Sequence, residues 1–303
     1  MKYLVKYIFL FLVVSLAVFL IVRAIPISPE EMLLQRYNLP INEENKAVMR
    51  EMYGLNKGLI EQYFLWLKDF IRGDFGYSFV TKVPVKTEII RRLPYSIAMG
   101  LISLLLSMLI SFFLGYISAI KSGGIVDNLT RFISIFSLSV PSFILAIYII
   151  YFVGVRYKII KFFSGNIFSG MTTAIIILII YQIGSLSRVV KKSFEDVSKK
   201  TFVKFYLLRG FKIEYVLLRH CYKPVLYSLL SVSISKFSSV VGGSSVLEFL
   251  FAIPGVSYFL VSSIVARDYN FIQAYIFFIF IWMSVIHIIF DFLLNILKEK
   301  GVE

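Results

Sequence analysis

Long apolar runs separated by shorter polar stretches dominate the hydrophobic pattern of this chain. A hydrocarbon layer about 30 Å thick needs about 20 helical residues to cross it, and six runs are long enough. Leu, Ile and Phe dominate these runs, which lack the alternation of barrel strands. The pattern predicts an all-α integral membrane protein with six transmembrane helices, at residues 4–25, 95–120, 129–154, 171–189, 224–246 and 273–297.

Composition supports the same class, because 58% of the residues are hydrophobic and only 17% are charged. The first run follows Lys2 and Lys6, as in a secretory signal peptide, but no small-residue cleavage site follows it. We therefore expect this run to be retained as the first transmembrane helix.

The positions of Lys and Arg predict the orientation of the chain in its membrane. The two termini and segments 121–131 and 188–223 together hold 16 Lys/Arg, against four in segments 155–170 and 247–272. Both termini are therefore expected in the cytoplasm. The net charge of +14 mostly reflects the Lys and Arg residues that set the orientation of the chain in the membrane. Because these charges are spread over loops on opposite sides of the membrane, no nucleic-acid partner is expected.

Three parts are expected along the chain: a first transmembrane helix (1–25), an extracytoplasmic cap segment (26–94) and a core transmembrane domain (95–303). The cap contains helix-compatible pieces at 42–53 and 58–71. Its aromatic residues favour a compact cap over a disordered linker.

Segment 188–223 has a composition that suits neither a loop nor a membrane span. It holds ten Lys/Arg and three acids, with large apolar residues among them. We expect an amphipathic helical hairpin at the membrane surface. Composition alone leaves two partners open, a groove in another protein or anionic lipid.

The fifth span (224–246) is rich in serine and carries Lys236 near its middle. Serines permit close helix packing, while a lysine at that depth is costly unless it faces water or a partner. The span is therefore either an interior packing face or one wall of a polar translocation path. In the second interpretation, Asp291 is a candidate counter-charge for Lys236, although it could equally anchor the last span near the inner surface. The path candidates are Ser231, Ser235, Lys236 and Ser239. Pro141 is expected to kink the third span, because it removes one helical hydrogen bond.

The sequence motifs of enzymes and of metal sites are missing. The chain has no GxxxxGK[ST], HExxH, CxxC or GxSxG, and only two histidines and one cysteine. We expect no catalytic residues, no metal site and no ATP hydrolysis by this chain. A secondary transporter would need carboxylates at mid-membrane. Asp291, the only acid in any predicted span, lies toward one end.

Six short motifs, in order and at compatible spacing, resemble those of ABC importer permeases of the dipeptide/oligopeptide/nickel branch, B-type subunit. The resemblance runs nearly from end to end of the chain. The motifs are Arg23-Ala24-Ile25-Pro26, Gly73-Asp74-Phe75-Gly76-Tyr77-Ser78, Arg92-Leu93-Pro94, Leu138-Ser139-Val140-Pro141-Ser142-Phe143, Glu248-Phe249-Leu250-Phe251-Ala252-Ile253-Pro254-Gly255 and Ala266-Arg267-Asp268-Tyr269.

The resemblance implies a type I ABC importer permease fold in a bacterial plasma membrane, with segment 188–223 as the cytoplasmic coupling hairpin between helices 4 and 5. It implies as partners a second homologous permease, two ABC ATPase subunits that bind ATP and Mg, and an extracellular solute-binding protein. Short peptides are the implied substrate, and nickel or a metal chelate is the nearest alternative. The implied ATPase-docking residues are Phe202, Phe205, Tyr206, Leu208, Gly210 and Phe211.

The hairpin also departs from the family pattern. Tyr206 and Leu208 stand where the family has small alanines, and Lys200 replaces an acid. We expect this bulk to meet an ATPase groove with an unusual lining.

Overall fold

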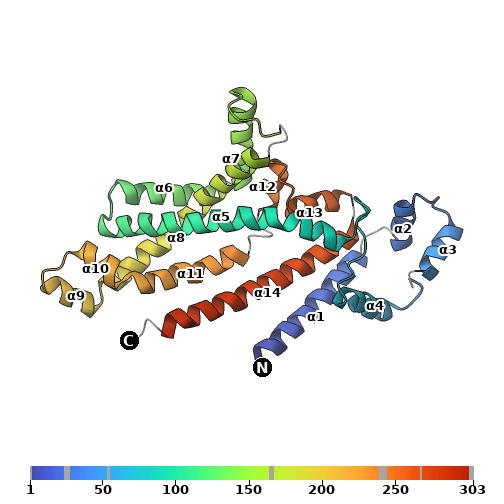
Figure 1. Ribbon diagram of the computed structural model, residues 1–303, viewed down its shortest axis with the longest axis horizontal. Helices are drawn as coiled ribbons and strands as arrows, with labels where there is room; N and C mark the ends of the chain where they lie inside the picture. The colour runs from blue at the N-terminus through green and yellow to red at the C-terminus, as the bar shows by residue number, and fades with distance from the viewer. Residues whose placement is uncertain are drawn as a thin grey trace. The chain divides into compact units, whose positions relative to one another are not determined.

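The computed structural model describes residues 2–23, 28–52, 55–163, 167–238, 244–266 and 268–299. Within these ranges every element is helical, apart from one antiparallel bridge between Tyr77 and Pro84 (Figure 1). The predicted all-α class is confirmed. The chain divides into two compact units, which are described separately: unit 1 is Met1–Arg92 with Phe259–Ser284, and unit 2 is Leu93–Tyr258 with Val285–Glu303.

Unit 1 is built around aromatic packing between its first and fourth helices. Phe19 of α1 meets the Tyr63 ring edge-on at 5.5 Å, and the Ser15 hydroxyl lies 2.6 Å from the Tyr63 hydroxyl. Trp66 and Phe277 extend the cluster, with ring centroids 5.2 Å apart. The helices that lie wholly in unit 1 are α1 (Lys2–Arg23), α2 (Pro29–Tyr37), α3 (Glu43–Met52) and α4 (Leu59–Ile71). The starts of α5 (Val85–Ile120) and α14 (Tyr269–Glu299) and most of α13 (Val256–Val265) complete the unit.

The predicted cap helices at 42–53 and 58–71 correspond to α3 and α4, whereas α2 was not anticipated. α2 and α3 pair through a small apolar cluster of Leu33, Leu34 and Met49 and through two ion pairs. Arg50 lies 2.7 Å from Glu30, and Lys46 lies 2.8 Å from Glu31. The short α2 carries too few apolar residues to show a helical period.

Unit 2 is built on α8, which packs against α6 on one side and α11 on the other. Gly184 of α8 permits the close approach to α6, because a Cβ there would lie 2.5 Å from Ser137 Oγ and 2.9 Å from Ser134 Cα. The elements of unit 2, besides parts of α5, α13 and α14, are α6 (Ile125–Ser139), α7 (Ser142–Ile149), the π-helix η1 (Ile150–Arg156), α8 (Ile167–Ser198), α9 (Thr201–Leu208), α10 (Ile213–His220), α11 (Tyr222–Ser238) and α12 (Ser245–Leu250).

Two helices extend well beyond the predicted spans, and α14 exceeds its span by a few residues at its start and end. α5 begins at Val85 rather than at residue 95, and α8 continues to Ser198 rather than ending at 189. At the start of α5, Glu88 pairs with Arg91 at 2.9 Å and with Arg92 at 2.8 Å, so charged residues continue the helix instead of ending it. Segment 188–198 is therefore the end of α8, and the hairpin proper is α9 and α10.

Pro141 breaks the third predicted span rather than kinking it. α6 ends at Ser139, α7 begins at Ser142, and the two directions differ by 98°. Pro141 itself has an extended backbone and precedes the first turn of α7. A proline cannot donate the helical hydrogen bond, and it disfavours helical geometry at the residue before it, here Val140.

By length and composition, three described helices can cross a membrane, and the bent pair α6–α7/η1 makes up to four. The three are Val85–Ile120, Ile167–Ser198 and Tyr269–Phe292. The predicted first span continues past Arg23, and the predicted fifth span runs into residues 239–243, which lie outside the described ranges. A total of six spans stays a prediction.

Candidate functional site

The α9–α10 hairpin is held by a turn at Gly210. The Gly210 amide donates to the Leu207 carbonyl at 2.9 Å, and the Phe211 amide donates to the Tyr206 carbonyl at 3.2 Å. Gly210 has φ +87°, a backbone conformation that disfavours any other residue. A Cβ at this position would meet nothing within 4 Å, so backbone geometry alone requires the glycine.

The buried side of the hairpin joins the core of unit 2. Val203 of α9 and Val216 of α10 are fully buried in one cluster with Phe194 of α8 and Val225 of α11. The Tyr116 hydroxyl of α5 donates to the Glu214 carbonyl at 3.0 Å. Cys221, at the end of α10, lies in the same cluster, and burial raises the pKa of its thiol to about 11. The hairpin is therefore packed onto three long helices rather than extending freely from them.

Tyr206 lies at the centre of an aromatic cluster that links α9 to α10. Its ring stacks on the His220 imidazole with centroids 4.3 Å apart and meets Phe211 edge-on at 5.7 Å. Phe211 in turn stacks on Tyr215 at 5.8 Å. Tyr206 is half-buried by these contacts. Its large ring is accommodated within the hairpin.

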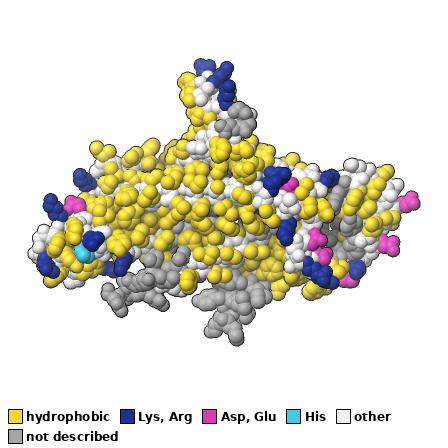
Figure 2. Space-filling model, viewed as in Figure 1, with side chains coloured by type: hydrophobic (Ala, Val, Ile, Leu, Met, Phe, Trp, Pro, Cys, Tyr) yellow, Lys and Arg dark blue, Asp and Glu magenta, His cyan; other side chains and the backbone are white. Residues whose placement is uncertain are grey.

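Other predicted docking residues are exposed on the hairpin. Leu208 is 88% exposed and Phe205 58%, while Phe202 and Phe211 are exposed to about 40%. The Arg209 guanidinium lies 5.6 Å from the centroid of the Phe205 ring. Figure 2 shows basic side chains gathered over the α9–α10 hairpin and a largely hydrophobic face along the other helices of unit 2. The hairpin thus presents apolar side chains within a basic surface.

The ion pair of the buried Asp127, in the first turn of α6, was not predicted from the sequence. Asp127 lies 2.7 Å from Lys191 of α8, and its carboxylate also accepts from the Gly123 amide at 2.8 Å. This pair fixes the tight turn before α6 to the part of α8 that leads into the hairpin. The sequence places the two residues in separate polar stretches, so neither suggests the other.

Three of the four predicted path residues, Ser231, Ser235 and Lys236, lie in the described part of α11. The Ser231 hydroxyl donates to the Tyr227 carbonyl at 2.7 Å, and that of Ser235 to the Val232 carbonyl at 3.0 Å. Lys236 is half-buried, and Ser239 lies outside the described residues. These hydroxyls are bonded within their own helix, so the translocation path stays a prediction.

The predicted Lys236–Asp291 pair is neither confirmed nor contradicted. The neighbours of the two residues, Phe237 and Phe290, have ring centroids 5.5 Å apart, so α11 and α14 lie side by side at this level. Asp291 is exposed.

Glu248 forms the centre of a compact turn between α12 and α13. Its carboxylate is fully buried and accepts hydrogen bonds from the Ser244 hydroxyl at 3.1 Å and the Tyr258 amide at 2.9 Å. Burial raises the pKa of this carboxyl, against the opposing effect of those donors. A Cβ at Gly255 would lie 2.2 Å from Glu248 Oε2, so the carboxylate fills the space that a side chain at 255 would need.

In unit 1, Asp268 of the motif at 266–269 contacts the motif at 73–78. Its carboxylate accepts from the Ser78 hydroxyl, from the Phe79 amide at 2.9 Å and, at the start of α14, from the Phe271 amide at 3.3 Å. The Asn270 side chain donates to the Tyr77 carbonyl at 3.0 Å. The loop that follows Gly76 is thereby fixed to the first turn of α14. Arg23 to Pro26, from the first motif, and Arg267, the neighbour of Asp268, have no described side chains.

Within the described residues, no group of three or more His, Cys, Asp or Glu side chains could hold a metal ion.

Comparison with known proteins gives the chain a family. Residues 111–300 match the model of the "Binding-protein-dependent transport system inner membrane component" family, and residues 1–100 match the model of the N-terminal part of such membrane components. The Nickel import system permease protein NikB of Staphylococcus aureus strain MRSA252 is 28% identical over 297 residues, covering 98% of this chain and 89% of the relative. NikB of strain USA300 is 28% identical over 288 residues, covering 95% of this chain and 87% of the relative.

Both family matches together cover nearly the whole chain, and the membrane-compatible helices of the structure agree with them. Such a subunit is a non-catalytic, multi-pass membrane component, and separate ATPase subunits bind the ATP. The chain belongs to the binding-protein-dependent transport system inner membrane components, the permease subunits of bacterial ABC importers.

Proposed function

We propose that the exposed apolar side chains of the α9–α10 hairpin dock into a groove of a partner ATPase and couple ATP hydrolysis to transport. The single observation that carries this proposal is the two-sided character of the hairpin. Val203 and Val216 anchor one side in the core, while Phe205 and Leu208 project outward from a basic surface. Exposed aromatic and aliphatic anchors on a short helix are typical of helix-in-groove recognition.

The proposed assembly contains this chain, a second homologous permease, two ATPase subunits that bind ATP with Mg, and an extracellular solute-binding protein. In it, both termini and the hairpin face the cytoplasm, and residues 26–94 face outward. Closure of the ATPase dimer would displace both coupling hairpins and change which side of the path is open. A secondary transporter would have no use for the docking surface.

Substitution at Phe205 tests the docking proposal. Phe205→Asp places a charge in the proposed groove and should abolish retention of the ATPases during purification, while membrane insertion stays normal. Lys204→Gln is the matched control, because Lys204 is its exposed neighbour outside the proposed apolar contact. Coupled uptake at the normal rate by the Phe205→Asp variant would contradict docking at this surface.

For the substrate, we propose nickel or a nickel chelate, which is what the names of the relatives support. Short peptides are the second candidate, supported by the motif resemblance to the wider dipeptide/oligopeptide/nickel branch. At 28% identity, a relative's substrate is a starting hypothesis for this chain.

Uptake measurements separate the two substrates. A host that lacks its own nickel and peptide importers would express this chain together with its neighbouring transport genes. Accumulation of radioactive nickel, lost in the Phe205→Asp variant, supports the nickel proposal. Accumulation of a labelled dipeptide without nickel uptake would replace it with the peptide candidate.

A further inference from the structure

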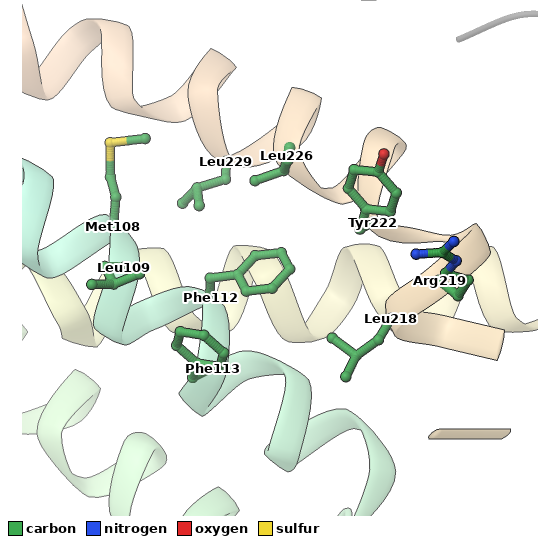
Figure 3. A pocket seen from close by; sticks show the side chains of 9 residues that line it. All are labelled: Met108, Leu109, Phe112, Phe113, Leu218, Arg219, Tyr222, Leu226 and Leu229. Atoms are coloured by element: carbon green, nitrogen blue, oxygen red, sulfur yellow. The ribbon is translucent and has the colours of Figure 1, made fainter. Parts of the chain in front are cut away.

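An open, mainly apolar groove lies in unit 2 beside the hairpin, with a volume of about 760 Å³. Its walls come from α5, α10 and α11, and include Phe112, Phe113, Leu226 and Leu229 (Figure 3). This volume is within the range of about 300–1,000 Å³ that is typical of small-molecule sites. The groove is distinct from the proposed docking surface, whose residues do not line it.

The polar groups of the groove lie at one end. Arg219 and Tyr222 are found there, while Met108 and Leu229 lie toward the other end (Figure 3). The lining contains no acid, and within the described part of the chain no ion pair or hydrogen bond engages the Arg219 guanidinium. One end of the groove therefore offers an exposed cation, and the rest offers hydrocarbon contact.

We propose that this groove binds one anionic phospholipid, with the headgroup phosphate on Arg219 and an acyl chain along Phe112 and Leu226. A guanidinium binds phosphate oxygens through two parallel hydrogen bonds. Basic pockets between membrane helices on the cytoplasmic side are suited to acidic headgroups. A tyrosine beside the cation is typical of the membrane–water interface. The proposal rests on the predicted cytoplasmic position of the hairpin but not on ATPase docking.

The groove also connects the lipid to the hairpin. Arg219 and Leu218 belong to α10, whose opposite side carries the buried Val216 and Leu217. A lipid in this position would contact α10 and the two long helices that support it. We therefore expect the lipid to stabilise the hairpin against local opening.

Native mass spectrometry of the full-length chain tests the site with two probes of equal acyl length, phosphatidylglycerol and phosphatidylcholine. The wild-type chain should retain phosphatidylglycerol preferentially. The Arg219→Gln variant should lower that retention about fivefold, since one basic residue near an anionic surface contributes about 1 kcal/mol. Lys204→Gln removes an exposed charge from the same hairpin outside the groove and should retain phosphatidylglycerol as the wild type does.

A second pair of variants tests the apolar part without changing charge. Leu226→Trp fills the groove and should reduce retention of both lipids, whereas Tyr227→Trp, at the neighbouring position outside the lining, should not. Equal retention of the two lipids by the wild type, or unchanged retention in Arg219→Gln, would overturn the proposal. It would also be overturned if a photo-crosslinker at residue 226 captured the second permease rather than phospholipid in native membranes.

Discussion

The ring of Tyr206 stacks on the imidazole of His220 at 4.3 Å with 16° between the ring planes. This contact joins the end of α9 to the end of α10. The bulk at Tyr206 was expected to alter the partner groove, but the ring lies half-buried within the hairpin. Leu208 is 88% exposed, so we expect its side chain, more than that of Tyr206, to contact the partner groove.

Tyr206→Ala should loosen the hairpin, because an aromatic pair contributes about 0.5–1.5 kcal/mol beyond its buried area. Trypsin should then cleave at Lys204 or Arg209 several-fold faster than in the wild type, measured on purified protein in detergent. Leu208→Ala should leave cleavage unchanged but weaken ATPase retention. If both variants behave alike in the two assays, then Tyr206 does not act mainly in packing the hairpin and Leu208 does not act mainly in contacting the ATPase.

Gly210→Ala tests the turn. The backbone at φ +87° should cost an alanine about 1–2 kcal/mol, although there is space for its Cβ. We expect faster trypsin cleavage in the turn and lower ATPase retention. Gly58→Ala is the control, because a Cβ there also meets nothing within 4 Å and its φ is −62°. Normal behaviour of Gly210→Ala would show that the turn tolerates another geometry.

Gly255→Ala should destabilise unit 2, because its Cβ would lie 2.2 Å from Glu248 Oε2 and 2.6 Å from Ser96 Oγ. Overpacking of this kind typically costs about 1–3 kcal/mol. The measurement is the thermal unfolding midpoint in detergent. Combined with Glu248→Ala, which opens the space, the alanine at 255 should cost less than it does alone. Additive effects would argue against contact between the two residues.

The raised pKa of the Glu248 carboxyl predicts a pH dependence of stability. Because the folded state favours the protonated form, this group stabilises the fold at low pH, and that contribution is lost as the pH rises through the raised pKa. Wild-type unfolding midpoints should therefore fall more steeply with rising pH than those of Glu248→Gln. Parallel curves for the two proteins would contradict the assignment.

Asp268→Ala should release the loop after Gly76 from the start of α14. The variant leaves the Ser78 hydroxyl and the Phe79 and Phe271 amides without their acceptor, and each buried donor left unpaired costs about 1–3 kcal/mol. Hydrogen exchange should accelerate at residues 77–81 and in the first turn of α14. Asp69→Ala, on the exposed side of α4, should leave exchange in both segments unchanged.

The apolar runs predicted most of the long helices, because membrane-compatible length is recorded directly in the sequence. Their ends were predicted less well. Charged residues at 85–94 and 188–198 indicate where a helix leaves the hydrocarbon, but a helix continues beyond that point when its backbone bonds remain intact. The break at Pro141 exceeded the predicted kink because Val140 also takes an extended backbone.

Contacts within the candidate site were beyond prediction from sequence patterns. An aromatic residue that stacks inside the hairpin and one that is exposed look the same in composition, so the different environments of Tyr206 and Phe205 could not be predicted. Ser78 and Asp268 are 190 positions apart, and the periodicity of hydrophobic residues gives no information on contacts at that separation. Both residues lie in motifs that resemble the family pattern, but the motifs do not indicate that the two side chains meet. The Glu248 carboxylate likewise has Ser96, which lies far away in the chain, as a hydrogen-bond partner.

The continuation of α8 to Ser198 has a mechanical consequence. A helix of 32 residues is about 48 Å long and resists bending far better than a loop does. Phe194 and Val197, near its end, are packed against the hairpin, and Gly184 lies against α6 at its middle. A force applied to the hairpin would therefore act on a stiff helix that is fixed to α6 at Gly184 and, through Lys191, at Asp127, so that α8 and α6 would move together without a flexible joint between them.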